Sequence, residues 1–351
     1  MTNNIKKIAL FVSSGLGNAV MLVPLLKKLK EDIKNRVTIF LDSPFVSRNF
    51  LIHNEFPFDE IIEITKINKT IIIFANIQSF DIIYLDYSSS SLKNVLISRL
   101  ISKKIIAFRE NIIPFLNITY REEEKNTHAC VLNLQLFDKE FNESDFDIAE
   151  LKLIINDAEK PEIINNIELR GKIPVVIQTS SANRNAPYKN WSVNSWIFLL
   201  NKISENFPDL YFILMGDENE ITISNRITNE LQGSFIDITG KTDLIEMCNI
   251  LYFAKLYIGL DSGVMHLAAA YDIPTFSIFG ASSYNYFGYE KFKDIHKVIY
   301  NPINCWPCLG YKYTNRSKVK SPKDCPDIIC LNNKKPDEVT SSFIRFYHAL
   351  R

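Results

Sequence analysis

The sequence predicts an α/β protein with two Rossmann-like domains, and three observations support this class. Short apolar runs alternate with amphipathic segments of helical length between residues 7 and 108, a pattern typical of parallel βαβ units. The polar segment 156–172 contains Pro161 and interrupts the pattern, which begins again at residue 173. The length of 351 residues also suits two domains of ordinary size.

Four strands and two helices are expected in the first half of the chain. Each strand is a short apolar run, and each helix is a longer amphipathic segment. The strands are expected at 7–13, 36–41, 81–85 and 104–108, and the helices at 19–33 and 92–101. We therefore expect a first domain over residues 1–160, with a hinge at the polar segment.

The second half repeats this alternation. Strands are expected at 173–178, 210–215, 235–238, 256–260 and 275–279, and helices at 192–206, 218–231, 243–254 and 264–271. We therefore expect a second domain over residues 161–335. In such a bilobed protein, the natural ligand site is the cleft between the lobes, at the carboxyl ends of the strands.

Charge and hydropathy limit the possible partners. The 40 Lys and Arg residues balance the 40 Asp and Glu residues, which excludes a chain held on nucleic acid by a bulk positive field. Apolar runs such as 70–77 are far shorter than the roughly 18–20 residues of a membrane-spanning helix. Lys6 and Lys7 before an apolar run imitate a signal peptide, but Ser13 ends that run and no cleavage site follows. We expect a cytoplasmic protein.

The segment 256–270 is the most informative motif. A buried strand is expected to end at Asp261, and a helix to begin at Ser262 and Gly263. Asp or Ser can cap such a helix, and Gly lets the backbone lie close to a ligand. The free N–H groups and the positive end of the helix dipole would suit a pyrophosphate, and His266 could add a donor. The alternative is an ordinary capped helix with a hydrogen-bonded histidine.

A second anion site is indicated at 179–191. Hydroxyl groups at Thr179 and Ser180 follow a strand, and Arg184 and Lys189 come before the next helix. Such a loop is a plausible phosphate cradle, although it lacks the Gly-Lys-Ser/Thr ending of a Walker A loop. A solvated basic loop is the alternative interpretation.

The loop at 13–18 contains Gly15 and Gly17 and is similar to a dinucleotide fingerprint. Val20 occupies the position of the third glycine, whereas Asp42 lies where a ribose-binding acid is expected. An NAD-dependent oxidoreductase is therefore one alternative function.

Four of the six cysteines lie near the C-terminus, in a C-x2-C pair followed by a looser pair. These four could hold a structural zinc ion, and the alternatives are buried thiols or a redox pair. They are Cys305, Cys308, Cys325 and Cys330.

Several of these segments together resemble glycosyltransferase family 9, the bacterial lipopolysaccharide heptosyltransferases. The phrase from Asp261 to Ala270 is similar to the family's hallmark, as are Gly17-Asn18 with Pro24 and the Lys189-Asn-Trp191 sequence. The resemblance implies a GT-B fold, with two Rossmann-like domains facing a central cleft and no catalytic metal or other cofactor. It also implies a C-terminal helix over residues 336–351 that packs back on the N-terminal domain.

The resemblance assigns roles to particular residues. An ADP-heptose-like nucleotide-sugar would bind the C-terminal domain, and a glycolipid or glycan acceptor would bind the N-terminal domain. Gly15 and Gly17 would form the acceptor-side loop. Donor-binding residues would be Thr179, Ser180, Lys189, Glu218, Asp261, Ser262, Gly263 and His266.

The implied reaction is an inverting transfer of a sugar, heptose in most of the family, to a lipopolysaccharide core or related cell-surface glycan. The family's usual base is an aspartate, and this chain has Asn18 at that position. A neutral amide does not take up a proton at pH 7. Asn18 would instead orient the acceptor, with Asp86 or another carboxylate as the base; the alternative is a catalytically weak or non-catalytic binding protein.

A lipid-linked acceptor would bring the protein to the cytoplasmic face of the inner membrane. Peripheral contact could use a set of basic residues, and the alternative is that these form a solvated helix face and its loop. They are Lys93, Arg99, Lys103, Lys104 and Arg109.

Overall fold

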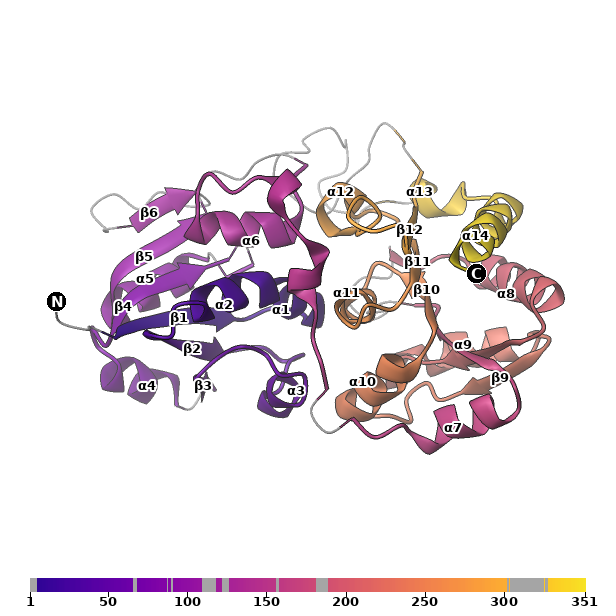
Figure 1. Ribbon diagram of the computed structural model, residues 1–351, viewed down its shortest axis with the longest axis horizontal. Coiled ribbons are helices and arrows are strands. Elements are labelled where there is room, and N and C mark those ends of the chain that lie inside the picture. Colours follow the sequence, from indigo (N-terminus) through magenta and orange to yellow (C-terminus); the bar gives the residue numbers. More distant parts are fainter. Residues whose placement is uncertain are drawn as a thin grey trace. The chain divides into compact units, whose positions relative to one another are not determined.

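The chain divides into two compact units, Met1–Asn156 and Asp157–Arg351 (Figure 1). The boundary predicted from the sequence lies slightly later, after residue 160. The computed structural model describes residues 5–65, 68–86, 88–89, 91–108, 118–121, 126–155, 158–180, 189–301, 303, 325 and 328–351. Among these residues, no helix has the length and apolar character needed to cross a bilayer.

The first unit contains a six-stranded parallel sheet with the order β3-β2-β1-β4-β5-β6. Its strands are β1 (Lys6–Val12), β2 (Asn35–Leu41), β3 (Glu60–Glu63), β4 (Phe80–Leu85), β5 (Ser102–Phe108) and β6 (Ile118–Arg121). Its α-helices are α1 (Leu16–Met21), α2 (Val23–Lys30), α3 (Arg48–His53), α4 (Lys69–Ala75), α5 (Leu92–Ile101) and α6 (Ala129–Phe137), followed by the 3-10 turns η1 (Glu143–Asp145) and η2 (Ile148–Leu151).

The helices of the first unit cover both faces of its sheet. Right-handed crossovers to the left and to the right of β1 place helices on opposite faces. Accordingly, α2 packs on α1 and α6, whereas α5 packs on α4, β4 and β5. The core beneath α5 includes Phe40, Phe80 and Val95, and the rings of Phe40 and Phe80 meet edge to face at 5.4 Å.

The second unit repeats the topology, with the order β12-β11-β10-β7-β8-β9. Its strands are β7 (Ile173–Gln178), β8 (Leu210–Leu214), β9 (Ser234–Asp237), β10 (Leu256–Leu260), β11 (Thr275–Ile278) and β12 (His296–Ile299). Its helices are α7 (Glu162–Leu169), α8 (Val193–Asn206), η4 (Glu218–Glu220), α9 (Ile221–Thr228), α10 (Leu244–Phe253), α11 (Gly263–Ala270), α12 (Tyr284–Phe287), α13 (Ile329–Asn332) and α14 (Pro336–Leu350).

The strand order reverses direction at one point in each sheet. In the first unit this point lies between β1 and β4, and in the second it lies between β7 and β10. Ligands of doubly wound sheets bind at such switch points, outside the carboxyl ends of the strands. The loops that follow these four strands are therefore the places where the topology predicts ligand sites.

Two local expectations need correction. The helix expected at 19–33 is two helices, because Pro24 lies in the first turn of α2 and cannot donate a backbone hydrogen bond within a continuous helix. The segment 156–172, expected as a polar hinge, contains α7, which begins directly after Pro161. Its apolar side is buried through Ile164 and Ile167.

The C-terminal helix α14 packs within the second unit, against α8. The ring of Phe343 meets that of Phe276 edge to face at 5.2 Å, and the ring of Tyr347 meets that of Phe207 at 4.8 Å. The family resemblance assigned this helix to the N-terminal domain. Its apolar face is part of the core of its own unit, because amphipathic helices bury the face that carries their aromatic residues. Packing of this helix on the N-terminal domain stays a prediction.

Candidate functional site

Two loops meet at the switch point of the second unit. Gly259 of β10 is paired with Gln178 of β7, so the residues that follow these two strands leave the sheet at the same edge. Thr179 and Ser180 follow β7, and Asp261 follows β10. The structure therefore brings together the two segments that the sequence analysis proposed separately as anion sites.

An ion pair joins the two segments. Lys189 Nζ lies 2.7 Å from Asp261 Oδ2 and also donates to the Asp261 backbone carbonyl at 3.3 Å. Asp261 is only 4% exposed, whereas the Lys189 side chain keeps 23% of its surface exposed. Burial favours the neutral acid, but the Lys189 ammonium and His266 outweigh it and hold the pKa of Asp261 below its ordinary value. The ion pair therefore fixes the Lys189 ammonium at this edge of the sheet, where part of the Lys189 side chain is exposed to solvent.

Ser262 begins helix α11 as its N-cap. Its Oγ accepts a hydrogen bond from Met265 N at 3.4 Å, as expected for a serine at this position. The same hydroxyl donates to Gln178 Oε1, which also accepts from the Tyr257 hydroxyl at 2.9 Å. Ser262 is thus fixed by two buried partners, and the first turn of α11 is directed at the carboxyl edge of the sheet.

Gly259 makes room for this network. A Cβ atom at this position would lie 2.3 Å from the Tyr257 hydroxyl and 2.9 Å from the Gln178 carbonyl oxygen. Only glycine therefore allows the Tyr257 ring to lie along β10 with its hydroxyl against Gln178 and Ser262. Neither Gln178 nor Tyr257 was predicted from the sequence as part of the site; the available signal for Gln178 was a polar residue at the end of an otherwise apolar strand.

His266 is buried behind the helix start. Its Nδ1 lies 2.8 Å from the Tyr289 hydroxyl, and its Nε2 lies 3.9 Å from Asp261 Oδ1. Burial lowers the pKa of His266 to about 4, although Asp261 acts in the opposite direction. The imidazole is therefore neutral at pH 7 and lies beside Asp261 within the unit.

The acidic segment after β8 contributes Glu220 rather than Glu218 to the neighbourhood of this edge. Glu218 is exposed, whereas Glu220 is buried and accepts a hydrogen bond from Asp217 N at 3.1 Å. Burial raises the pKa of Glu220, and an interaction with the Ser180 hydroxyl opposes that rise. Gly216 permits this position, since a Cβ there would lie 2.1 Å from Glu220 Oε2.

A second polar group lies at the switch point of the first unit. Asn18 Nδ2 donates to Ser14 Oγ at 3.0 Å, Ser14 Oγ donates to Ser88 Oγ at 2.9 Å, and Ser88 Oγ donates to Asp86 Oδ2. Ser14 follows β1 and Ser88 follows β4, which are neighbouring strands. The two residues proposed as catalytic, Asn18 and Asp86, are thus the ends of one hydrogen-bonded chain.

Asp86 is a buried carboxylate at the receiving end of this chain. It is 4% exposed and accepts further bonds from the backbone N–H of Ser89 at 3.0 Å and from the Ser89 hydroxyl. Burial raises the pKa of Asp86 above its ordinary value, although the serine donors act against that rise. A raised pKa makes a carboxylate a better proton acceptor. Ser14, Ser88 and Ser89 were not identified from the sequence.

The remaining residues that were predicted from the sequence are Gly15, Gly17, Asp42 and Arg184. Gly15 is the N-cap of α1, and a Cβ there would meet no atom within 4 Å, so packing alone does not require glycine. Gly17 lies in the first turn of α1. Asp42 is half-buried at the end of β2. Arg184 lies outside the described residues.

The proposed zinc site is only partly described. Cys305 and Cys308 lie outside the described residues, Cys325 is half-buried, and Cys330 is buried; neither of the latter two forms a disulfide. Within the described ranges, no group of three or more His, Cys, Asp or Glu side chains is arranged to hold a metal ion. The four-cysteine site stays a prediction.

Comparison with known proteins links these sites to a family. The sequence pattern of glycosyltransferase family 9 (heptosyltransferase) matches residues 78–318. Lipooligosaccharide heptosyltransferase 2 from Campylobacter jejuni is 25% identical over 344 residues, covering 95% of this chain and 96% of that protein.

Two solved structures share the fold. ADP-heptose lps heptosyltransferase II from E. coli has a TM-score of 0.68 at 17% identity, over 96% of this chain and 99% of that one. TibC, an iron-containing dodecameric heptosyltransferase solved with ADP-D-beta-D-heptose, has a TM-score of 0.61 at 16% identity, over 99% of this chain and 77% of that one. Together with the two parallel six-stranded sheets, these likenesses confirm the predicted α/β class with two Rossmann-like domains, GT-B.

Proposed function

This chain belongs to glycosyltransferase family 9, and we propose that it transfers a heptose or a closely related sugar from a nucleotide-sugar to a lipopolysaccharide or lipooligosaccharide core. The observation that carries the proposal is the Lys189–Asp261 pair beside the start of α11, at the switch point of the second unit. The whole-length similarity to the C. jejuni enzyme supports the same class of acceptor. The proposed site of action is the cytoplasmic face of the inner membrane.

The donor in this proposal is ADP-heptose or a similar nucleoside diphosphate sugar. Its diphosphate would lie between Lys189 and the N–H groups of Ser262 and Gly263, with the hydroxyls of Thr179 and Ser180 alongside. Negative charge develops on the departing diphosphate as the glycosidic bond breaks, and fixed positive groups at that place stabilise the transition state. His266 positions Asp261, which in turn positions Lys189. Either Glu218 or the nearby Glu220 would bind ribose.

The proposed reaction is a single displacement with inversion, in which the first unit accepts the proton. The acceptor hydroxyl would donate to Ser14 Oγ, the Ser14 proton would pass to Ser88, and the Ser88 proton to Asp86. As this transfer proceeds, the acceptor oxygen bonds to the anomeric carbon. The bond from that carbon to the diphosphate oxygen breaks, and the nucleoside diphosphate leaves with the electron pair. Asn18 would hold Ser14 in place through its amide N–H.

The direct test measures nucleoside diphosphate release. We expect ADP release from ADP-heptose that depends on a heptose-deficient lipooligosaccharide core, with the sugar recovered on that core. The proposal also requires no resident metal ion, so that chelation with EDTA should leave the rate unchanged. Failure to bind any nucleotide-sugar would refute the proposed function.

Variants of Lys189 test the donor site. Lys189→Met should raise the Kd for ADP about tenfold or more, because it removes a charge-assisted contact to phosphate. Lys202→Met is the matched control, since Lys202 forms an exposed pair with Glu205 on α8. Equal effects of the two substitutions would contradict the assignment.

Variants of the serine chain test the proton path. Asp86→Asn should lower kcat by roughly 10²- to 10⁴-fold, the usual contribution of a general base. Ser88→Ala should lower kcat as well, whereas Asp138→Asn, on an exposed loop after α6, should not. Because the pKa of Asp86 is raised, wild-type activity should fall on the acidic side as this carboxyl is protonated. A kcat unchanged in Asp86→Asn would exclude this path.

The identity of Asn18 favours a second candidate, a binding protein that retains the fold without turnover. In that case the wild type would bind the nucleotide-sugar without transferring it, and Asn18→Asp would create activity. Robust wild-type turnover would exclude this candidate.

A further inference from the structure

Three phenylalanines are exposed in the part of the first unit that the structure describes. Phe45, Phe74 and Phe137 are 56%, 69% and 41% exposed. Phe137 is the last residue of α6, and Phe74 lies in the last turn of α4, which connects β3 to β4 and therefore ends at the amino edge of the sheet. Of the three, Phe45 is the one that lies in a loop directly after a strand, β2.

The loop that contains Phe45 leaves the sheet beside the loop that contains Ser14. Strands β1 and β2 are parallel neighbours with Val12 opposite Leu41, and Asp42 N continues the pairing by donating to the Val12 carbonyl at 2.9 Å. The carboxyl ends of the two strands therefore meet at one edge of the sheet. Phe45 thus belongs to the same edge as Ser14, where the proposed proton path begins.

The hydroxyl of Ser43 joins these two loops. Ser43 Oγ donates to the Ser14 carbonyl oxygen at 2.6 Å and accepts from the backbone N–H of Phe45 at 3.1 Å. Two hydrogen bonds through a single oxygen atom therefore separate the backbone of Phe45 from that of Ser14. Pro44 lies between Ser43 and Phe45, and its fixed φ further restricts the loop.

The Phe45 side chain remains exposed although its loop is anchored. The next residue, Val46, is 4% exposed and belongs to the apolar interior of the unit. More than half of the Phe45 surface stays in contact with water, so its burial by a ligand would still be favourable. Because the loop is already restricted, covering the ring would cost little conformational entropy. Phe45 is therefore a preformed apolar surface beside Ser14.

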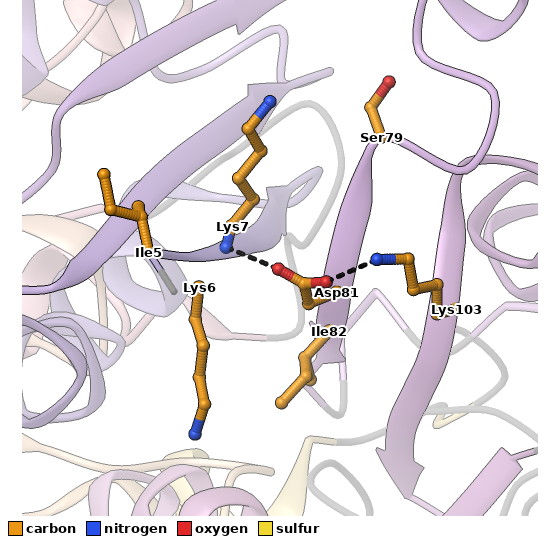
Figure 2. A pocket seen from close by; sticks show the side chains of 7 residues that line it. All are labelled: Ile5, Lys6, Lys7, Ser79, Asp81, Ile82 and Lys103. Atoms are coloured by element: carbon orange, nitrogen blue, oxygen red, sulfur yellow. Dashed lines mark hydrogen bonds and ion pairs between the residues drawn. The ribbon is translucent and has the colours of Figure 1, made fainter. Parts of the chain in front are cut away.

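A pocket of the same unit lies at the opposite end of the strands. It has a volume of about 540 Å³ and is lined by Lys6, Lys7, Asp81 and Lys103, among others, at the amino ends of β1, β4 and β5. Figure 2 shows Lys103 directed at Asp81, whereas the side chains of Lys6 and Lys7 extend away from that carboxylate. The ammonium groups therefore do not converge on one point, and this pocket lies away from the edge that carries Phe45.

We propose that the Phe45 ring is a platform on which a sugar ring of the acceptor stacks. A pyranose carries hydroxyl groups around its rim and C–H groups on its two faces, so one face can cover a flat aromatic ring while the rim makes hydrogen bonds. A sugar stacked on Phe45 would have its rim beside Ser14, the group to which the attacking hydroxyl donates in the proposed reaction. The ligand is the acceptor of the proposed function, on which this inference rests.

Phe45→Trp tests the platform without any turnover. The native tryptophans, Trp191, Trp196 and Trp306, all belong to the second unit, so the added indole would report on the first unit. We expect its emission to shift to shorter wavelength when a heptose-deficient lipooligosaccharide core oligosaccharide is added, because a stacked sugar excludes water from the indole. Phe74→Trp is the matched control on α4 and should not respond. An emission spectrum of Phe45→Trp that the oligosaccharide leaves unchanged would overturn the platform.

Kinetic variants separate the platform from the proposed function. Phe45→Ala should raise the KM for the core acceptor about tenfold and change the Kd for ADP by no more than about twofold, because the lost apolar contact belongs to the acceptor alone. Phe45→Tyr keeps the ring, and its KM should stay within about threefold of the wild-type value. Lys103→Gln, in the pocket at the amino edge, should behave as the wild type does.

The two failures have different signatures. Robust wild-type turnover with an unchanged acceptor KM in Phe45→Ala would overturn the platform and leave the proposed function intact. If the core oligosaccharide shifts the emission of Phe45→Trp but ADP-heptose is not turned over, the platform holds and the proposed function fails.

Discussion

The second unit should lose stability as the pH falls from about 6.5 to about 4, because two of its histidines are buried in the neutral form. His266 and His296 are 3% and 1% exposed. Burial lowers the pKa of each to about 4, and the cation of Lys293 lowers that of His296 further. The unfolded chain binds a proton at each histidine near pH 6.5, whereas the folded chain does not. Stability is thus complete above pH 6.5 and is lost as the pH falls towards 4.

The magnitude follows from the difference between the two pKa values. A shift from 6.5 to about 4 is 6.5 − 4, or about 2.5 units, which corresponds to about 3 kcal/mol for each histidine once the pH is below both values. At pH 5 each histidine should already have lowered the free energy of unfolding by about 2 kcal/mol. Two independent sites would therefore lower the free energy of unfolding by about 4 kcal/mol between pH 7.5 and pH 5.

The assay can follow this unit selectively. Trp191 and Trp196 are buried in its core with their rings 5.3 Å apart, and the third tryptophan, at 306, also belongs to residues 157–351. Urea titrations followed by tryptophan fluorescence at pH 7.5 and pH 5 would give the loss for the wild type, for His266→Asn, for His296→Asn and for the double variant. Each single substitution should remove about half of the loss attributed to these sites. A double variant with the full wild-type loss would refute the reasoning.

Two further substitutions test the packing that supports the site. Gly259→Ala should destabilise the second unit by about 1–3 kcal/mol and weaken ADP binding, because the added methyl group would displace the Tyr257 hydroxyl from Gln178. Urea titration would measure the loss of stability and ADP titration the loss of affinity, and an unchanged ADP affinity would contradict the link to Ser262. Phe343→Ala should lower the free energy of unfolding by about 3–5 kcal/mol in the same fluorescence assay, because this fully buried ring lies between α8 and the sheet. Phe45→Ala changes a side chain that is 56% exposed and should alter this free energy by no more than about 0.5 kcal/mol; similar losses in the two variants would argue against the described packing of α14.

Much of the local structure could be predicted from short stretches of sequence. The strands at 173–178 and 256–260 and the helix at 92–101 have the predicted bounds, because each is an apolar or amphipathic segment ended by polar residues. Ser262 also caps its helix as the motif indicates. In contrast, the short edge strands β3, β6 and β12 were missed.

The partners of the site residues could not be predicted in the same way. Ser14 and Ser88 are 74 residues apart in the chain, and Ser262 and Gln178 are 84 apart. They meet because β1 lies beside β4 and β7 lies beside β10. The choice of Glu220 over Glu218 beside Ser180 likewise depends on which carboxylate turns inward at the end of β8.

The sequence by itself therefore determined the α/β class, the two repeated halves, the family resemblance and the loops of the candidate site. Each of these depends on residues close together in the chain, where hydrophobic periodicity, capping and turn chemistry act. Only the tertiary structure decided that Asn18 and Asp86 share one hydrogen-bonded chain, that His266 stays neutral, and that α14 packs on α8. The physical reason is that strand order and burial arise from contacts between distant segments, and these set both the hydrogen-bond partners and the pKa values.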